Sequence, residues 1–339
     1  MTSPIDALLD WIALPSITGA EADYAAALAD RLEAAGFAVE RQEVAPGRFN
    51  VLARAGEPRV VFCTHLDTVP PWFGPSRRGG AIHGRGACDA KGPAVAMLEA
   101  ARRLLAAREE RIGLLFTVGE EVDSAGARRA NEALAPPWRP RYTIVGEPTA
   151  NRFVRGGKGV FRGTLHARGV AGHSALAGGP SAIHALVGAI QRLLAEEWGH
   201  DDVFGRGTIN IGEIAGGVAA NVVAPRATAS VMVRAVEGPA AVEARIRRHL
   251  GEHVELVAPV GYGPIRFALP AGDEGPVVAF GTDAPFLPAW GTPLLYGPGR
   301  IEDAHTVEEK IAVESLEQAI ADYEAAARTL LARIDAGAA

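Results

Sequence analysis

Two histidines and several carboxylates occupy positions in the sequence where they could bind metal ions. His65 and Asp67 are separated by one residue and end the segment V-V-F-C-T-H-L-D, and Asp89 lies in the Gly-rich segment G-R-G-A-C-D-A-K-G. His-x-Asp is a spacing at which a carboxylate can orient a metal-binding imidazole. Further carboxylates and a second histidine follow along the chain. The candidate metal ligands are His65, Asp89, Glu121, Glu147 and His305.

The number and type of these ligands favour a catalytic site with two metal ions. Nitrogen and oxygen donors suit zinc, and cobalt or manganese can replace it. Five protein ligands exceed the four of a closed structural zinc site. If one carboxylate bridges, each of two ions receives three ligands and water fills the open positions, as in two-metal hydrolases. The sequence therefore predicts two Zn²⁺ per chain, with Asp67 orienting His65 from outside the coordination shell.

The adjacent carboxylates of Glu120 and Glu121 indicate how such a site could hydrolyse an amide. Neighbouring like charges repel, so the pair is a poor structural choice unless both side chains face water. A metal ion resolves the conflict, because one carboxylate coordinates while the other faces the activated water. The second carboxylate can then accept the proton of that water and pass it to the leaving amine.

The composition of the chain is that of a globular enzyme and excludes other classes. With 339 residues, two domains are expected, and 48% hydrophobic residues supply ample core. A formal net charge of −6 argues against nucleic acid or an anionic membrane as the main partner. No apolar run reaches the roughly 20 residues of a membrane-spanning helix. Two cysteines cannot form a disulfide framework, and the first residues lack signal-peptide features, so a cytoplasmic location is expected.

The elements that position these residues follow from the apolar patterns. Apolar runs alternate with helical patterns over residues 5–145, which predicts an α/β domain with a mixed, mostly parallel sheet flanked by helices. His65, Glu120-Glu121 and Glu147 each follow the end of an apolar run. In open α/β sheets that edge of the sheet is where ligands bind. Strand-like runs are expected at 37–44, 49–53, 60–64, 112–118 and 142–145, and Pro93 is expected to open a helix.

The pattern of apolar and polar residues changes near residue 152, which predicts a second domain. Alternating strands and two amphipathic helices follow in the order β-α-β-β-α-β, which is typical of a ferredoxin-like α+β layer. The pattern of the first domain returns afterwards, with apolar runs at 277–280 and 294–296 and a helix at 311–334. We therefore expect a domain at 152–262 inserted into one formed by 1–151 and 263–339. On the strand at 228–234, Arg234 is expected on the polar face.

Seven motifs in this order resemble the dinuclear zinc amidohydrolases. This family includes acetylornithine deacetylase, succinyl-diaminopimelate desuccinylase, aminoacylase and the glutamate-releasing carboxypeptidases. The resemblance runs from about residue 5 to 330 and includes the inserted layer, which serves the family as a lid and dimerisation domain. The motifs are H-L-D-T-V-P, G-R-G-A-C-D-A-K-G, G-E-E, G-E-P, A-G-H-S, A-N-V-V-A-P and A-H-T-V-E-E.

The resemblance implies a role for each matching residue. Asp89 matches the bridging ligand and Glu120 the general base, with His65 and Glu147 on one zinc and Glu121 and His305 on the other. In the lid, His173 matches a histidine that completes the partner subunit's site and stabilises the oxyanion. Two further lid residues match substrate-facing positions, and a G-T-D turn matches the substrate lining, although Phe280 replaces the small residue usual before it. These substrate-binding candidates are Asn221, Arg234, Gly281 and Thr282.

Among members of the family, G-E-P at the third ligand station and the short chain resemble acetylornithine or acetyl-lysine deacetylases. The implied reaction is hydrolysis of the amide bond of a small N-acyl amino acid by a homodimer. Enzymes that release lysine or ornithine from a small amino-group carrier protein, and dipeptidases or carboxypeptidases, share similar motifs. A catalytically silent sensor of amino-acid derivatives is a non-enzymatic alternative, which the intact Glu120 disfavours.

Overall fold

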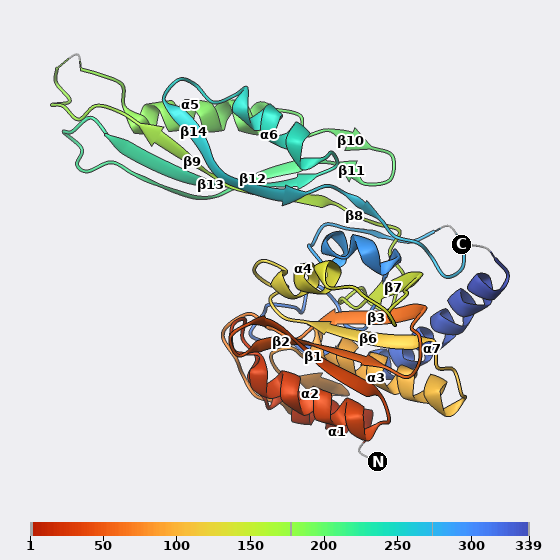
Figure 1. Ribbon diagram of the computed structural model, residues 1–339. Helices are drawn as coiled ribbons and strands as arrows, with labels where there is room; N and C mark the ends of the chain where they lie inside the picture. The colour runs from red at the N-terminus through yellow and green to blue at the C-terminus, as the bar shows by residue number, and fades with distance from the viewer. Residues whose placement is uncertain (1–2, 177, 273, 338–339) are drawn as a thin grey trace. The chain divides into compact units, whose positions relative to one another are not determined.

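The computed structural model describes residues 3–176, 178–272 and 274–337 of the chain. The chain forms two units (Figure 1). The first unit comprises Met1–Arg155, Phe267–Pro276 and Thr282–Ala339, and the inserted unit comprises Gly156–Arg266 and Val277–Gly281. The insertion expected at 152–262 is thus displaced by four residues at each end, and the short segment Val277–Gly281 was not expected in it.

The first unit is built on a six-stranded sheet in the order β1-β2-β6-β3-β7-β17. β6, β3, β7 and β17 run parallel, whereas β1 and β2 are antiparallel additions at one side, so the predicted mixed sheet is confirmed. Every residue of β3, β6 and β7 is buried, which explains their continuous apolar runs. The strands are β1 Ala38–Ala45, β2 Arg48–Arg54, β3 Val60–His65, β6 Ile112–Thr117, β7 Tyr142–Val145 and β17 Thr292–Leu295. A smaller sheet joins β18 Lys310–Ala312, β5 Ala81–His83 and β4 Ser76–Arg78.

Helices cover both faces of this sheet, and the alternation of buried side chains shows which face each strand residue serves. Val60 and Phe62 pack with α1 Pro4–Ile12, α2 Ala22–Ala34, α3 Lys91–Ala106 and α7 Val313–Asp335. Val61 and Cys63 pack with α4 Ala125–Glu132 and the 3₁₀ helices η1 Ala284–Phe286 and η2 Pro288–Trp290. No helix within the described ranges is both long and apolar enough to cross a membrane.

The helix expected from Pro93 begins two residues earlier, at Lys91. The buried Lys91 Nζ donates hydrogen bonds to the main-chain oxygens of Trp11 (3.0 Å) and Leu14 (2.6 Å), at the carboxyl end of α1. A cation is favoured there because the carbonyl groups of a helix end carry partial negative charge. Lys91 thereby ties the start of α3 to the end of α1.

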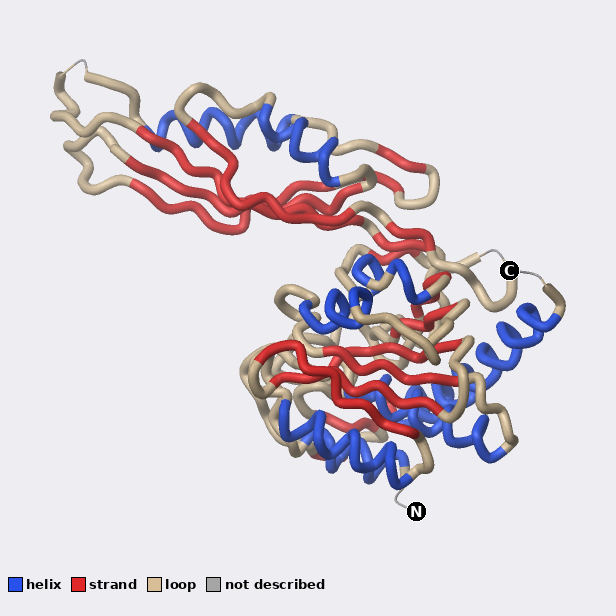
Figure 2. Tube along the Cα trace, in the orientation of Figure 1, coloured by secondary structure: helices blue, strands red, loops and turns tan. Residues whose placement is uncertain are grey.

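The inserted unit is a four-stranded antiparallel sheet in the order β12-β13-β9-β14, with both long helices on one face (Figure 2). Its chain order β9-α5-β12-β13-α6-β14 confirms the predicted ferredoxin-like layer. The main elements are β9 Gly159–Arg168, α5 Ala182–Ala195, β12 Thr208–Gly216, β13 Arg226–Ala235, α6 Pro239–Arg247 and β14 Val254–Tyr262. Short strands complete the unit: β8 Gly156–Gly157, β10 His200–Asp201, β11 Gly205–Arg206, β15 Ile265–Arg266 and β16 Val277–Val278.

The strand expected at 277–280 in the first unit was wrongly placed. Only Val277–Val278 is extended in a sheet, and these residues are half-buried and pair in parallel with β8 in the inserted unit. The position beside β7 is already taken by β17, whose main chain pairs with all four residues of β7. Val277 and Val278 of this run pair with Gly156 and Gly157 instead.

Candidate metal centre

The parallel strands of the first unit bring the predicted ligands to one edge of the sheet. His65 is the last residue of β3, Glu120 and Glu121 follow β6, and Glu147 follows β7 by two residues. Since β6, β3 and β7 are parallel neighbours, these side chains start from the same edge. Gly119 turns the chain after β6 with a positive φ of 82°, a conformation that glycine adopts without strain.

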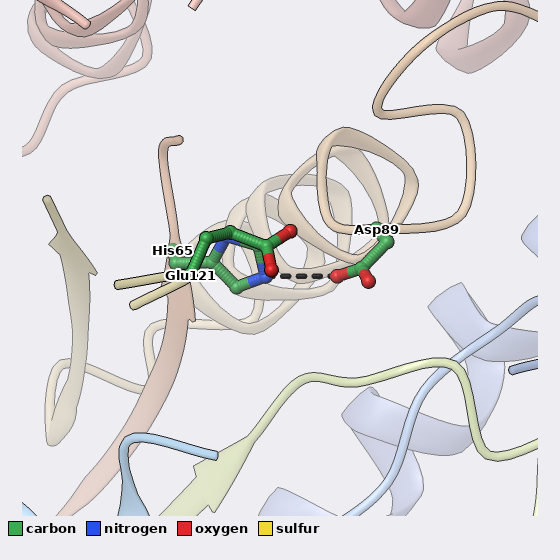
Figure 3. A group of neighbouring side chains, drawn as sticks. All are labelled: His65, Asp89 and Glu121. Atoms are coloured by element: carbon green, nitrogen blue, oxygen red, sulfur yellow. Dashed lines mark hydrogen bonds and ion pairs between the residues drawn. The ribbon is translucent and has the colours of Figure 1, made fainter. Parts of the chain in front are cut away.

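The side chains of His65, Asp89 and Glu121 converge in space (Figure 3). His305 also contacts Asp89 and Glu121. Asp89 Oδ1 lies 2.9 Å from His65 Nε2, and Asp89 Oδ2 lies 3.2 Å from His305 Nε2. His305 Nε2 is also 3.0 Å from Glu121 Oε1. Ligand atoms of His65, Asp89 and Glu121 all lie within 4.8 Å of one another. Asp89 therefore stands between the two histidines, with one oxygen toward each.

Glu147 contributes a buried carboxylate, one oxygen of which lacks a hydrogen-bond partner among the described residues. It is 4% exposed, and its Oε1 has no hydrogen-bond partner within residues 3–176, 178–272 and 274–337. A buried carboxylate oxygen without a partner is costly, so such an atom calls for a cation or a proton. Burial, together with the nearby carboxylate of Glu120, raises the pKa of Glu147 well above its usual range.

The pKa values of the neighbouring groups show the same crowding of negative charge. Burial raises the pKa of Glu120 well above its usual range, and Asp283, Glu121 and Asp89 add to the shift. The carboxylates of Asp89 and Glu121, which accept hydrogen bonds from the imidazole, raise the pKa of His305 to about 10. Burial and mutual repulsion thus disfavour the ionised form of the Glu120 and Glu147 carboxylates.

Divalent cations fit this set of residues. They would supply the positive charge that the buried carboxylates lack. The donor atoms are imidazole nitrogens and carboxylate oxygens, which are common zinc ligands. Among the described residues, His65, Asp89 and Glu121 lie close enough together to hold one such ion.

Asp67 holds the site together differently from the prediction. Its main-chain oxygen, rather than its carboxylate, is the hydrogen-bond partner of His65 Nδ1, at 2.9 Å. The carboxylate Oδ1 is 3.6 Å from that nitrogen. Instead the carboxylate accepts hydrogen bonds from the main-chain N–H groups of Gly119, Glu120 and Glu121, at 3.0–3.2 Å, and from the Thr18 hydroxyl at 2.8 Å. One residue thereby fixes both His65 and the loop that carries the glutamate pair.

The backbone of His305 is held in a costly conformation. Its φ is +62°, in the left-handed region, which costs a non-glycine residue roughly 1–2 kcal/mol. Such conformations persist where the surroundings impose them, and they cluster at functional sites. This one places the half-exposed His305 side chain against Asp89 and Glu121.

Two of the predicted lid residues lie together within the inserted unit. The chain around His173 pairs with the chain around Asn221, because Ser174 N donates to Asn221 O (3.0 Å) and His173 bridges to Val222. Both side chains are exposed. Arg234 is half-buried near the other end of β13, on the face opposite the buried Val231 and Val233. Within this unit Arg234 is therefore not brought to His173 and Asn221.

The predicted G-T-D turn spans the boundary between the two units. Gly281 belongs to the inserted unit, and a Cβ added there would lie 2.7 Å from the Tyr262 hydroxyl. Thr282 belongs to the first unit, where it is buried and its hydroxyl accepts a hydrogen bond from Ala284 N (3.2 Å). The Thr282 hydroxyl thus binds the first N–H group of η1, a contact that the sequence did not predict.

Two buried carboxylates near the site, Asp283 and Glu309, lie in motifs recognised in the sequence but were not among the predicted site residues. Asp283 accepts a 2.6 Å hydrogen bond from the Thr117 hydroxyl, and burial raises its pKa to about 6. Glu309 is fully buried beneath the Asp89 segment, while the adjacent Glu308 is exposed and pairs with Arg78. The doublet Glu308-Glu309 resembles Glu120-Glu121 and follows His305 closely, which was the available signal.

Comparison with known proteins identifies the family. Residues 61–329 match the peptidase family M20/M25/M40. A peptidase M20 domain-containing protein of Schizosaccharomyces pombe is 35% identical, with 92% of this chain and 81% of the relative covered. A probable carboxypeptidase of Neosartorya fischeri is 36% identical, with 93% and 83% covered.

Solved structures agree in fold. A tripeptidase from Staphylococcus aureus has a TM-score of 0.80 at 21% identity, covering 96% of this chain and 97% of its own. A dinuclear metal-binding M20 peptidase of Bacillus subtilis has a TM-score of 0.71 at 16% identity, with 97% of both chains covered. The predicted resemblance and metal dependence are thus confirmed: the chain belongs to peptidase family M20/M25/M40 and is a metal-dependent hydrolase.

Proposed function

We propose that this enzyme hydrolyses the amide bond on the amino side of an amino acid that carries a free α-carboxylate. The observation that carries the proposal is the placement of Asp89, whose two oxygens face two different histidines at 2.9 and 3.2 Å. A carboxylate so placed fits a bridge between two cations. His65 and Glu147 would hold one Zn²⁺, and Glu121 and His305 the other. When bound, the ions supply an activated water with a pKa near 7 and polarise the substrate carbonyl.

Glu120 is the residue we assign as general base and acid. Its main-chain N–H is fixed by the Asp67 carboxylate, and its own side chain is half-buried beside the ligands. Burial and the neighbouring carboxylates raise its affinity for a proton, which suits a group that must accept one from water. Glu120 then donates that proton to the nitrogen of the departing amine.

The substrate class follows from a cationic residue on the inserted unit. Arg234 lies on the polar face of β13, where its planar group of donors can bind a carboxylate with two hydrogen bonds. The motifs favour an N-acyl amino acid of the acetylornithine or acetyl-lysine type. The probable carboxypeptidases among the relatives favour a second candidate, the C-terminal residue of a peptide. An amino acid held by a small carrier protein presents the same type of bond.

A homodimer through the inserted unit is part of the proposal. Arg234 and the start of β13 at Arg226 are separated by roughly 26 Å, because each strand residue adds about 3.3 Å. One small substrate therefore cannot contact Arg234 and the His173–Asn221 pair of the same protomer. A partner supplying His173 and Asn221 removes this conflict. Exposed apolar side chains on α5, the edge strand β12 and the loop after β12 offer a contact surface: Val187, Leu194, Ile214 and Val218.

The assignment of the glutamate pair predicts two different phenotypes. Glu120→Gln should bind zinc as the wild type does but lose about 10²–10⁴-fold in kcat, because proton transfer in the transition state fails. Glu121→Gln should instead weaken zinc affinity, because it removes a charged ligand. Zinc titration and steady-state kinetics on both variants give the answer, and exchanged phenotypes would show that the two roles are reversed.

The substrate class is tested with a panel of compounds that differ in one feature. Acetylornithine, acetyl-lysine, other N-acyl amino acids, dipeptides and their carboxyl amides should be compared by detecting the released amine. Amidation of the substrate carboxylate and Arg234→Ala should each cost about 2–4 kcal/mol in kcat/KM, and the two losses should not add. Additive losses would mean that Arg234 and the carboxylate never meet.

The dimer is tested by mixing two inactive variants. His173→Ala and Glu120→Gln subunits, once exchanged, should regain about one quarter of the wild-type activity, because half of the dimers are mixed and each has one intact site. Either variant alone, treated identically, is the control. Proven subunit exchange without recovery would place the His173 function within its own protomer or outside catalysis.

A further inference from the structure

Glu309 is a buried carboxylate that contacts the main chain of the Asp89 segment. It is 0% exposed and lies four residues after His305 and directly before β18. Its Oε1 accepts hydrogen bonds from the N–H groups of Gly86 (3.0 Å), Cys88 (3.2 Å) and Asp89 (3.2 Å). A single oxygen therefore gathers three donors from the segment that presents Asp89.

The other oxygen of Glu309 is held by a buried arginine. Arg85 Nη1 donates to Glu309 Oε2 at 2.6 Å, and Arg85 is 1% exposed. Arg85 is itself fixed, because its Nε donates to the main-chain oxygen of Pro71 and its guanidinium lies 5.2 Å above the centre of the Phe73 ring. The ion pair thus orients the Glu309 carboxylate so that Oε1 faces the Gly86–Asp89 main chain.

We propose that Glu309 is a positioning residue for metal binding, which sets the Asp89 carboxylate between His65 and His305. The inference rests on the proposed two-ion site. Glu309 follows His305 closely in the chain and binds the segment that carries Asp89. One carboxylate therefore links the segment that carries Asp89 to the segment that carries His305. The Asp89 main-chain N–H is bound by Glu309 while its two side-chain oxygens face the histidines at 2.9 and 3.2 Å. Groups that orient ligands from behind typically change metal affinity by about 10–100-fold.

Variants at position 309 separate reach from charge. Glu309→Asp keeps the charge but retracts the carboxylate from the three N–H groups, and Glu309→Met removes the acceptor. Glu309→Gln keeps a carbonyl acceptor at the original reach. A control is Glu109→Gln, since Glu109 also pairs with an arginine, Arg111 (2.8 and 2.9 Å), but lies before β6, at the opposite end of that strand from Glu121.

The readout is zinc affinity of the metal-free proteins, measured by competition with a chromophoric chelator, together with the absorption spectrum after Co²⁺ loading. Glu309→Asp and Glu309→Met should bind zinc about 10–100-fold more weakly and alter the Co²⁺ spectrum. Glu309→Gln should recover most of the affinity, and Glu109→Gln should match the wild type. Circular dichroism and thermal unfolding establish that each metal-free variant is folded, and if Glu309→Met is not, Glu309→Asp decides.

Two results would overturn the inference. A folded Glu309→Asp that binds zinc within twofold of the wild type would reduce Glu309 to a structural ion pair. A larger loss in Glu309→Gln than in Glu309→Asp would assign the effect to charge rather than to reach. Failure of the proposed function is distinguishable, because the wild type itself would then bind fewer than two zinc ions.

Discussion

Mutual repulsion among buried carboxylates is the constraint on which the organisation of the first unit depends. The carboxylates of Asp89, Glu120, Glu121, Glu147 and Asp283 influence one another's pKa values. Folding must bring these groups together at one sheet edge, where each additional negative charge raises the cost of the next. Such a cluster is tolerable when cations are bound or when protons are held in their place. The site thus couples the stability of this sheet edge to the occupancy of its metal ions.

The scaffold meets this cost with rigid main-chain contacts rather than with the ligands themselves. Three parallel strands whose residues are all buried fix the starting points of His65, Glu121 and Glu147. The Asp67 carboxylate accepts hydrogen bonds from three main-chain N–H groups of the loop that carries Glu120 and Glu121. The Glu309 carboxylate accepts three from the Asp89 segment. Two carboxylates that face backbone donors therefore steady the carboxylates that face the metal site. Because Asp67 and Glu309 bind the main chain, the carboxylates that face the metal site are not needed to hold these segments in place.

The sequence was informative where a residue type and its neighbouring pattern point to the same conclusion. The edge of the parallel sheet was predictable, because buried strands read as apolar runs and His65, Glu120-Glu121 and Glu147 follow their ends. Contacts between a carboxylate and main-chain groups far away in the sequence were not predictable. The Asp67 carboxylate lies 3.6 Å from His65 Nδ1, but its hydrogen bonds to N–H groups more than 50 positions along the chain were not predicted. Glu309 belongs to the motif A-H-T-V-E-E, but no role was predicted for it, because its main-chain partners lie more than 200 positions earlier in the chain.

The placement of the apolar run at 277–280 was wrong for a related reason. Apolar character predicts burial but does not specify which strand pairs with which, and β17 already occupies the position beside β7. The alternation on β13 was easier to read, because a half-buried antiparallel strand shows a period of two. The separation of Arg234 from His173 within one unit was not predictable, because it depends on the pairing of the chain around His173 with the chain around Asn221, which no local pattern contains.

Anomalous diffraction at the zinc absorption edge, from crystals of the zinc-loaded enzyme, tests the two-ion site most directly. Two peaks of comparable height are expected in each chain, one beside His65 and Glu147 and the other beside Glu121 and His305, with an Asp89 oxygen on each. A single fully occupied peak in a fully active enzyme, or two peaks that share no contact with Asp89, would contradict the bridging role on which the proposed chemistry depends.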